Sequence, residues 1–514
     1  METGKDLDGS SSDSLHLANG SEGSLSKRLL GYGVETRGIL PVPVEQRTDG
    51  QFSKIFFIWF SANFNILSFS SGTLGPLAFG LSARDSCLVI LFFNLLCAIP
   101  PSYLATWGPK LGLRQMVQAR YSFGYFGVIV PCVLNLITMI GFTTLNVILG
   151  GQTLASARSD GNLSWTVGIV IISLISLLFS FCGYKLLNRF ERVAWIPVCI
   201  TFIIALGIGG KHLSDPPTAA PASAIAVLSY GSVLAGYTIT WSGLSSDFTS
   251  YMRPDAPSWR IFLYAYLGFL IPIVTLHCIG AVFAAATLAN PLWQEGYLTG
   301  NVGGLLDAVL RPAGGFGKFL VVLLSLSVTG NVAITFYSIS LNIQTFLPIL
   351  LGVPRFVFST VAAAIVIPLG ILGAHSFHDT LLNFLSLIGY WATPFIAIVV
   401  SEHLIFRSPS SSSSPSSASS SNFSSSSRFS SYNLTHWDSP RHLPTGIPAL
   451  LAGIAGVGVA VPCIHQVWFV GPIAEKTGDI GFEVAFVVAG LVYVPLRAVE
   501  RRWALGRSGL DSGV

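Results

Sequence analysis

The sequence predicts an all-α integral membrane protein of about twelve transmembrane helices. Of its 514 residues, 51% are hydrophobic and only 10% are charged, against roughly 25% charged residues in an average soluble domain. Successive apolar runs approach or exceed the roughly 20 residues that a helix needs to cross the hydrocarbon core. In addition, Gly- and Ser-rich interruptions occur at corresponding places in two halves of the chain. Lipid is therefore the expected solvent.

Hydropathy along the chain gives the expected spans in order. The first 52 residues are polar and Ser-rich, and they are expected to form a disordered cytoplasmic tail. A ten-helix core covers 53–404, a Ser-rich cytoplasmic loop 405–444, two additional helices 445–500 and a cytoplasmic C-terminal tail 501–514. The twelve predicted spans are 54–79, 86–105, 128–151, 165–182, 193–212, 224–249, 260–286, 318–342, 356–373, 380–402, 445–463 and 482–499.

The basic residues predict the orientation. With the N-terminus in the cytoplasm, most of the 28 Lys and Arg residues fall in inner segments, as the positive-inside rule expects for an even number of spans. The outer segments hold only Arg84, Arg158, Lys211, Arg311, Lys318 and Lys476. Both termini are therefore expected on the cytoplasmic side, with the plasma membrane as the expected location.

One low-complexity segment, 408–431, is rich in Ser. Such a composition cannot bury a core, and we expect a disordered loop. It is either a tolerated insertion or a trafficking signal controlled by phosphorylation.

Two spans contain Gly- and Ser-rich stretches, Ser68–Pro76 in the first and Ser229–Tyr237 in the sixth. An odd number of spans per half inverts the second half, so spans 1–5 and 6–10 are predicted to form a LeuT-like inverted repeat. Unwound backbone at membrane depth is tolerated where it lines a cavity or binds something. The breaks are therefore expected to mark the substrate site, although Gly and Ser also allow helices to kink or pack closely.

Two polar stripes are expected to face the interior of the bundle, because amides that face lipid are costly. They either join helices or line a pathway. The spans have almost no charged residues at mid-depth, and His277 is the clearest buried titratable group. We expect it to be simply hydrogen-bonded; the alternative is a proton relay, because the reference pKa of His lies near 6.5. This pattern favours a neutral, planar, hydrogen-bonding solute. The stripes are Asn135, Thr138, Phe142 and Asn146 in span 3, and Asn331, Thr335, Ser338 and Asn342 in span 8.

Four segments resemble the fungal purine-cytosine permeases of the nucleobase:cation symporter family. They are WFSANFNILSFSSGTLGPLAFGL (59–81), NLLCAIPPSYLATWGPKLGLRQMVQARYSFGYFG (94–127), SFCGYKLLNRFERVAWIP (180–197) and SSDFTSYMRP (245–254). The resemblance covers about residues 40 to 500. It implies alternating access and proton-coupled uptake of purine bases and cytosine.

The same resemblance implies where the substrate binds. Carried over by motif, Ser68 is the contact of span 1, Asn146 the amide of span 3, Trp241 the stacking ring of span 6 and Asn331 the polar contact of span 8. Phe142 and Thr335 stand where family members often have Trp and a second Asn. We expect the base to lie between Trp241 and Phe142, with the polar groups reading its edge. Phe142 and Thr335 could instead favour another planar solute, such as vitamin B6.

The resulting prediction is a secondary transporter and not an enzyme, since no nucleophile–base pair, metal-ligand spacing or complete phosphate loop is present. No cofactor is expected, and the coupling ion is expected to be H⁺. The expected partners are a small nucleobase and membrane lipid, with no nucleic acid, and the sequence does not predict an oligomeric state. A nutrient sensor that binds without transporting is the alternative from a different functional class.

Overall fold

The computed structural model describes residues 38–158, 163–181, 189–213, 220–407 and 428–511, with side chains to residue 503. The first half contains α3 (Phe52–Asn63), α4 (Ile66–Phe79), α5 (Ala83–Cys97), α6 (Ile99–Ala105), α7 (Trp107–Leu111), α8 (Gln115–Gly127), α9 (Ile129–Ser156), α10 (Trp165–Phe181) and α12 (Trp195–Leu213). The second contains α13 (Ala224–Ile239), α14 (Ser258–Thr287), α15 (Pro291–Leu310), α16 (Gly314–Leu326), α17 (Thr329–Phe346), α18 (Arg355–Gly373) and α19 (Phe377–Ser401). The last part contains α20 (Ile447–Ala460), a hairpin of β1 (His465–Gln466) and β2 (Phe469–Val470), α21 (Ala474–Thr477) and α22 (Gly481–Asp511).

Each of the twelve predicted spans overlaps a described helix. Within the described residues, eight helical stretches are long and apolar enough to cross a membrane, or nine when α3 and α4 count as one bent span. Two of these stretches, Pro291–Phe346 and Arg355–Phe406, run through several consecutive helices, and α10 and α20 belong to shorter apolar helices. The helix α15, between spans 7 and 8, was not predicted.

The break in span 1 is not where the Gly and Ser content placed it. Residues Ser68–Pro76 lie inside the continuous helix α4, and the chain bends by 55° between Asn63 and Ile66. The Asn65 side chain caps α4 by accepting hydrogen bonds from the backbone N–H groups of Leu67 and Ser68. Asn is a preferred N-cap residue, and Asn65 stands directly before an apolar run. That signal marks the break better than the Gly content does.

The break in span 6 is also displaced. The predicted stretch Ser229–Tyr237 is regular helix within α13. The chain leaves the α-helix at Ile239 and continues as two 3₁₀ turns, η2 (Thr240–Gly243) and η3 (Ser245–Phe248). The predicted breaks therefore lie one to two turns from the observed ones.

Glycines in the two mispredicted stretches serve close packing instead. A Cβ on Gly72 would overlap the backbone of His277 on α14, and one on Gly236 would overlap the Leu385 carbonyl on α19. Small residues let helix backbones approach closely in membrane proteins. The composition that suggested unwinding thus reflects contact between neighbouring helices.

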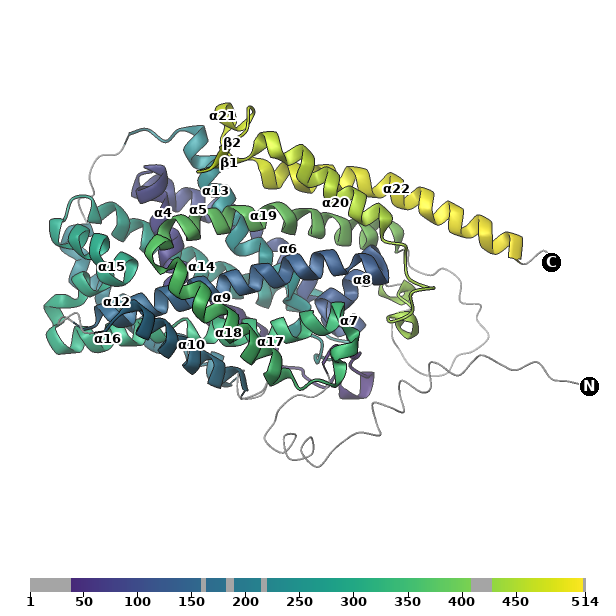
Figure 1. Ribbon diagram of the computed structural model, residues 1–514, viewed down its shortest axis with the longest axis horizontal. Helices are drawn as coiled ribbons and strands as arrows, with labels where there is room; N and C mark the ends of the chain where they lie inside the picture. The colour runs from purple at the N-terminus through teal and green to yellow at the C-terminus, as the bar shows by residue number, and fades with distance from the viewer. Residues whose placement is uncertain (1–37, 159–162, 182–188, 214–219, 408–427, 512–514) are drawn as a thin grey trace, which may run out of the picture.

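The spans pack in two groups. In one group α14 lies along α3, α4 and α5, and α13 packs against α4 and α5. In the other, α9 and α10 pack against α17 and α18. Figure 1 shows α20 and α22 side by side along one face of the bundle, next to α19. Helices α7 and α8 and the end of α22 lie at one end of the molecule, which we call the α8 end, while α15 and α16 lie at the other.

The predicted disordered tail is too long at its C-terminal end, because residues 38–52 pack on the helices. Ile39 and Val42 are fully buried. The Arg47 guanidinium is also buried and donates to the carbonyl oxygens of Val42, Pro109 and Leu111. The Arg47 side chain thereby fixes the segment that precedes α3 to α7. Residues 1–37 lie outside the described part of the chain, as does most of the predicted Ser-rich disordered segment.

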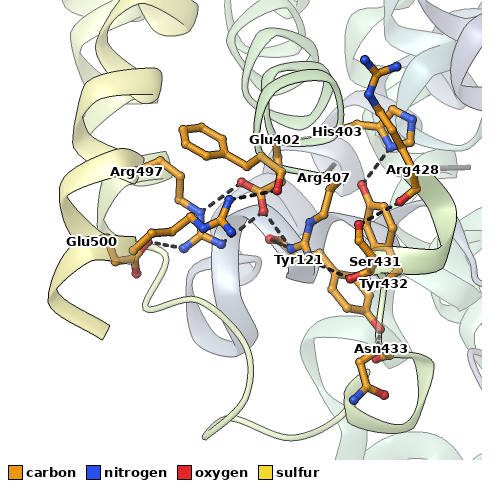
Figure 2. Close-up of polar contacts among 12 residues, drawn as sticks. Tyr121, Glu402, His403, Arg407, Arg428, Ser431, Tyr432, Asn433, Arg497 and Glu500 are labelled. Carbon is orange, nitrogen blue, oxygen red and sulfur yellow. Dashed lines mark hydrogen bonds and ion pairs between the residues drawn. The ribbon is translucent and has the colours of Figure 1, made fainter. Parts of the chain in front are cut away.

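A buried ion cluster joins the ten-helix core to the additional helix α22. Glu402 begins a turn of π-helix (Glu402–Phe406) at the end of α19 and is 1% exposed. Its carboxylate accepts from Arg497 at 3.0 and 3.1 Å and from the Tyr493 hydroxyl at 2.9 Å, and Arg407 lies 2.7 Å away. Figure 2 shows Glu402 between the two guanidinium groups. Both of its oxygens are thus satisfied.

The same cluster holds the segment that follows the Ser-rich stretch. Arg407 donates to the carbonyl oxygens of Tyr121 and Ser431, and its guanidinium lies 4.6 Å from the centroid of the Tyr432 ring (Figure 2). The Tyr121 hydroxyl donates to the Asn433 carbonyl, and burial raises the pKa of Tyr121 to about 12, so this donor stays neutral. Residues 428–431 form a 3₁₀ turn, which corrects the expectation of disorder for this part of 408–431.

Replacing Glu402 by Ala should destabilise the protein strongly. The change removes the carboxylate of the partly buried Arg407 and leaves the buried Arg497 with Glu500 alone, and breaking a buried pair typically costs about 3–5 kcal/mol. The measurement is the thermal unfolding midpoint of the protein purified in detergent.

The matched control is Asp307→Asn, which removes the partner of Arg311, a residue that is 64% exposed. This midpoint should stay close to that of the parent, because exposed ion pairs contribute little. Equal midpoints for both variants would contradict the role given to Glu402.

Candidate functional site

The two displaced breaks meet near the centre of the bundle, where one amide connects three spans. The Asn331 side chain on α17 donates to the Ala62 carbonyl at the end of α3, at 2.8 Å. Its oxygen accepts from the Asn146 amide on α9 at 3.1 Å. Unwinding between α3 and α4 leaves carbonyl groups without helical partners. Asn331 satisfies one of them and at the same time fixes the position of Asn146.

Aromatic rings lie one helical turn from this amide pair. Phe142 stands four residues before Asn146, and its ring lies 6.4 Å from that of Trp241 with an angle of 28° between the planes. The Tyr237 ring meets Phe142 edge-on at 5.8 Å. A planar solute between Phe142 and Trp241 needs about 7 Å between the rings, twice the ~3.5 Å carbon–carbon contact. The two rings are 28° from parallel, and their 6.4 Å separation is slightly too small for a solute between them.

Two of the predicted site residues are more remote. Ser68 is fully buried, lies 2.7 Å from the Tyr237 hydroxyl and donates to the Asn63 carbonyl at the break. It therefore contacts the site through Tyr237. Thr335 lies one turn beyond Asn331 and donates to the Asn331 carbonyl within its own helix. The structure thus brings Phe142, Asn146, Trp241 and Asn331 together, with Ser68 beside them and Thr335 at the edge.

Several buried polar atoms at the site lack a partner within the described part of the chain. Asn146 Oδ1 is an acceptor without a donor, and Trp241 Nε1 is a donor without an acceptor. Asn146 is fully buried and Trp241 is 5% exposed. Most buried polar groups in proteins are hydrogen-bonded, and an unsatisfied one carries a penalty of about 1–3 kcal/mol. An acceptor and a donor beside a pair of aromatic rings match the needs of a planar polar ligand.

A small polar cavity lies beside the N-terminal end of α8. The predicted stripes on spans 3 and 8 are buried throughout, which confirms that they face the interior. Members of both stripes line this small cavity together with Arg114 and Asp247. Arg114 closes this end by donating to the Asp247 carbonyl, and the Asp247 carboxylate accepts from the Gln115 backbone. The stripe residues at this cavity are Asn135, Ser338 and Asn342.

Two stripe amides both join helices and face the cavity. Asn342 Nδ2 donates to the Cys132 carbonyl at 2.6 Å, and Asn135 Nδ2 donates to the Gly243 carbonyl at 3.3 Å. These bonds join helices. The Oδ1 atoms of the same two side chains have no partner among the described residues, so they leave acceptors for water or solute in the cavity.

The sequence analysis missed two buried carboxyl groups, Asp479 and Glu191. Glu191 is fully buried beside Gly330, the first-turn neighbour of Asn331, although it was assigned to an inner loop. The helical stretch Arg189–Leu213 includes it. Hydropathy concealed this residue, because Arg189 and Arg192 flank it and both are exposed.

His277 also differs from its expectation. It is fully buried, but neither ring nitrogen has a hydrogen-bond partner in the described ranges. Its ring packs edge-on against Tyr237, with the centroids 5.0 Å apart.

The chain is similar to known transporters over nearly its whole length. Residues 41–485 match the model of a family described as permease for cytosine/purines, uracil, thiamine, allantoin. The purine-cytosine permease fcyB of Emericella nidulans is 34% identical over 473 residues, covering 91% of this chain and 89% of the relative. The vitamin B6 transporter TPN1 of Saccharomyces cerevisiae is 29% identical, covering 93% of this chain and 89% of that protein.

Solved structures show the fold. Mhp1, a nucleobase-cation-symport-1 family transporter in a closed conformation with bromovinylhydantoin bound, superposes with a TM-score of 0.65. The identity is 15%, and the match covers 92% of this chain and 96% of that one. The inward-facing conformation of Mhp1 gives a TM-score of 0.61. The architecture is thus the predicted LeuT-like inverted repeat followed by two helices. Because the family model and the relatives match most of its length, the chain belongs to the family of permeases for cytosine, purines and related solutes. It is a membrane transporter rather than an enzyme.

Proposed function

We propose that this protein imports purine bases and cytosine by proton symport with alternating access. The observation that carries the proposal is the pair of unsatisfied atoms, Asn146 Oδ1 and Trp241 Nε1, beside the nearly parallel rings of Phe142 and Trp241. A nucleobase is planar and neutral and has donors and acceptors along its edge. It would offer an N–H group to Asn146 and a ring face to the two aromatic side chains. The relatives named as purine-cytosine permeases support this substrate class.

The two packed groups of helices supply the moving parts of the proposal. Spans 1, 2, 6 and 7 would rock as one body against spans 3, 4, 8 and 9. The base would then lie between them, because Trp241 belongs to the first body while Phe142, Asn146 and Asn331 belong to the second. Closure of the α8 end by Arg114 and Asp247 would alternate with closure of the opposite end. The orientation that we propose has both termini in the cytoplasm and the carrier in the plasma membrane.

Vitamin B6 is the second candidate substrate, because one relative of similar coverage is named as its transporter. Pyridoxine is also planar and polar. Competition by cytosine, adenine, guanine, hypoxanthine, uracil, allantoin and pyridoxine against a labelled base ranks the candidates in one uptake experiment. A nutrient sensor would bind one of these solutes without accumulating it.

Replacing Asn146 by Ala should weaken uptake of labelled cytosine and adenine. The change removes the unpaired acceptor and also the bond to Asn331, and a buried hydrogen bond of this kind is worth about 1–3 kcal/mol. The apparent affinity should therefore fall by roughly 5- to 150-fold. Thr153→Ala, two turns along the same helix, is the control, because among the described residues the Thr153 hydroxyl bonds within its own helix, to the Leu149 carbonyl. Parental uptake by Asn146→Ala would refute the site.

Replacing Trp241 by Phe should preserve the binding of cytosine, whereas replacing it by Ala should weaken that binding. Stacking of a base on an aromatic side chain contributes about 1–3 kcal/mol as judged by Ala substitution, and Phe keeps a ring face. The measurement is the inhibition constant of unlabelled cytosine for each variant that reaches the membrane. Equal constants for Trp241→Ala and Trp241→Phe would exclude stacking at this position.

Proton coupling predicts how uptake responds to ion gradients. In vesicles, accumulation of the labelled base should collapse when a protonophore is added and should persist when Na⁺ is removed. It should also increase as the outside is made more acidic, because the inward proton gradient grows. The opposite ion dependence would assign the coupling to Na⁺.

A further inference from the structure

We propose that Glu191 is the residue that carries the coupling proton, and that it does so at the joint between the two moving groups of helices. This inference rests on the proposed symport and names its proton site. Glu191 is fully buried, and within the described ranges the polar side chain that reaches its carboxyl group is the Ser61 hydroxyl, with no charged partner beside it.

The position of Glu191 is fixed by residues of both groups. Ser61, in the last turn of α3, lies near the carboxyl group on one side. Gly330, in the first turn of α17, lies on the other, and a Cβ there would come within 2.5 Å of Glu191 Oε1. One turn after Glu191, the Trp195 ring packs against Phe60 of α3 at 5.2 Å. The absence of a side chain at residue 330 therefore makes room for the carboxyl group between α3 and α17.

The surroundings of Glu191 contain no compensating charge in the part of the chain that the structure describes. The neighbouring Arg189 and Arg192 are exposed. Helix α17 has no charged residue, and Lys54, the charged residue of α3, pairs with Asp49 at 2.6 Å. An ionised carboxylate is costly to bury without a partner, and a proton removes that cost. The packing of α3 against α17 around Glu191 is therefore compatible with a protonated carboxyl group and opposes an ionised one.

The joint also links the proton to the substrate. Ser61 precedes Ala62, whose carbonyl accepts from Asn331, and Gly330 precedes Asn331 itself. When α3 moves away from α17, the contact that encloses Glu191 and the contact that orients the Asn331–Asn146 pair open together. Water then reaches the carboxyl group, which releases its proton to that side. The return of α3 onto α17 requires one proton on Glu191. The two helices therefore resist closing when Glu191 is deprotonated and no substrate is bound.

His277 is a less suitable carrier, although it is also buried. It lies on α14 against α4, and both helices belong to the same moving group. Rocking of the two groups would leave its environment largely unchanged. A proton site must exchange between the two sides of the membrane, and the α3–α17 joint provides that change.

The test compares the parent, Glu191→Gln and Glu483→Gln in proteoliposomes. Glu483 is the matched control, because it is a partly buried carboxyl group on α22 with an unpaired Oε2, outside both moving groups. With an inward pH difference of about one unit and one proton per solute, the parent and Glu483→Gln should accumulate cytosine about tenfold. Glu191→Gln should only equilibrate cytosine, while its exchange of external for internal cytosine without a gradient stays within about threefold of the parent.

Each outcome distinguishes the coupling site from the transported solute. Gradient-driven accumulation by Glu191→Gln would overturn the assignment, as would loss of exchange along with accumulation in a folded variant. If the parent moves no nucleobase at all, the proposed function fails instead, and the same comparison with pyridoxine still tests Glu191.

A second measurement needs no variant. A hydrophobic carbodiimide reacts with protonated carboxyl groups, so mass spectrometry of the labelled parent should show modification of Glu191 that decreases as the pH rises. Added substrate should change that labelling, because substrate and proton share one joint. Labelling of Glu191 that ignores both pH and substrate would overturn the proposal.

Discussion

The side-chain amide of Asn331 is the contact on which the centre of this protein depends. A helix that is interrupted inside a membrane leaves carbonyl and N–H groups that lipid cannot satisfy. Asn331 provides a donor to Ala62 at the end of α3, while Asn65 caps the start of α4. Because the Asn331 oxygen also holds Asn146, the same side chain stabilises the break and orients the polar group nearest the aromatic rings. Backbone satisfaction and ligand recognition are therefore coupled through one residue.

The polar interior contains two kinds of amide that composition alone does not separate. Asn331 has both of its polar atoms occupied by protein groups, so its role is largely structural. Among the described residues, the side-chain oxygen of Asn146 has no partner, and neither do those of Asn135 and Asn342 nearer the α8 end. Asn135 and Asn342 line the cavity at Arg114. A transported solute needs polar groups that are not already hydrogen-bonded to the protein, and these side-chain oxygens are such groups.

Hydropathy located the spans well, because lipid imposes a length and a polarity on every crossing helix. Local composition did not locate the breaks. Gly72 and Gly236 serve close helix packing, and the chain unwinds instead at Asn65 and after Ile239, where capping and tertiary contacts decide. Glu191 was missed for a related reason. Its sequence neighbours are basic and exposed, and only the fold places its own side chain against Gly330.

The candidate site was partly visible in the sequence. The spacing of Phe142 and Asn146 puts both on one helix face, and the structure keeps them together. The contact of either residue with Trp241 or Asn331 depends on helices more than 90 residues apart in the chain, for which one sequence holds no direct signal. The burial of Ile39, Val42 and Arg47 is of the same kind, since Arg47 binds carbonyl groups that the chain reaches only after two further spans.

The ion cluster at Glu402 has a consequence for how the chain tolerates variation in length. Arg407 binds the carbonyl of Ser431, so the residues on either side of the Ser-rich stretch are held together independently of what connects them. Closing a longer flexible loop between fixed ends costs only about 0.6 kcal/mol for each doubling of its length. A fluorescent protein or an epitope inserted between these two anchors would therefore disturb the transport core little, and this position is a natural attachment point for imaging the carrier in living cells.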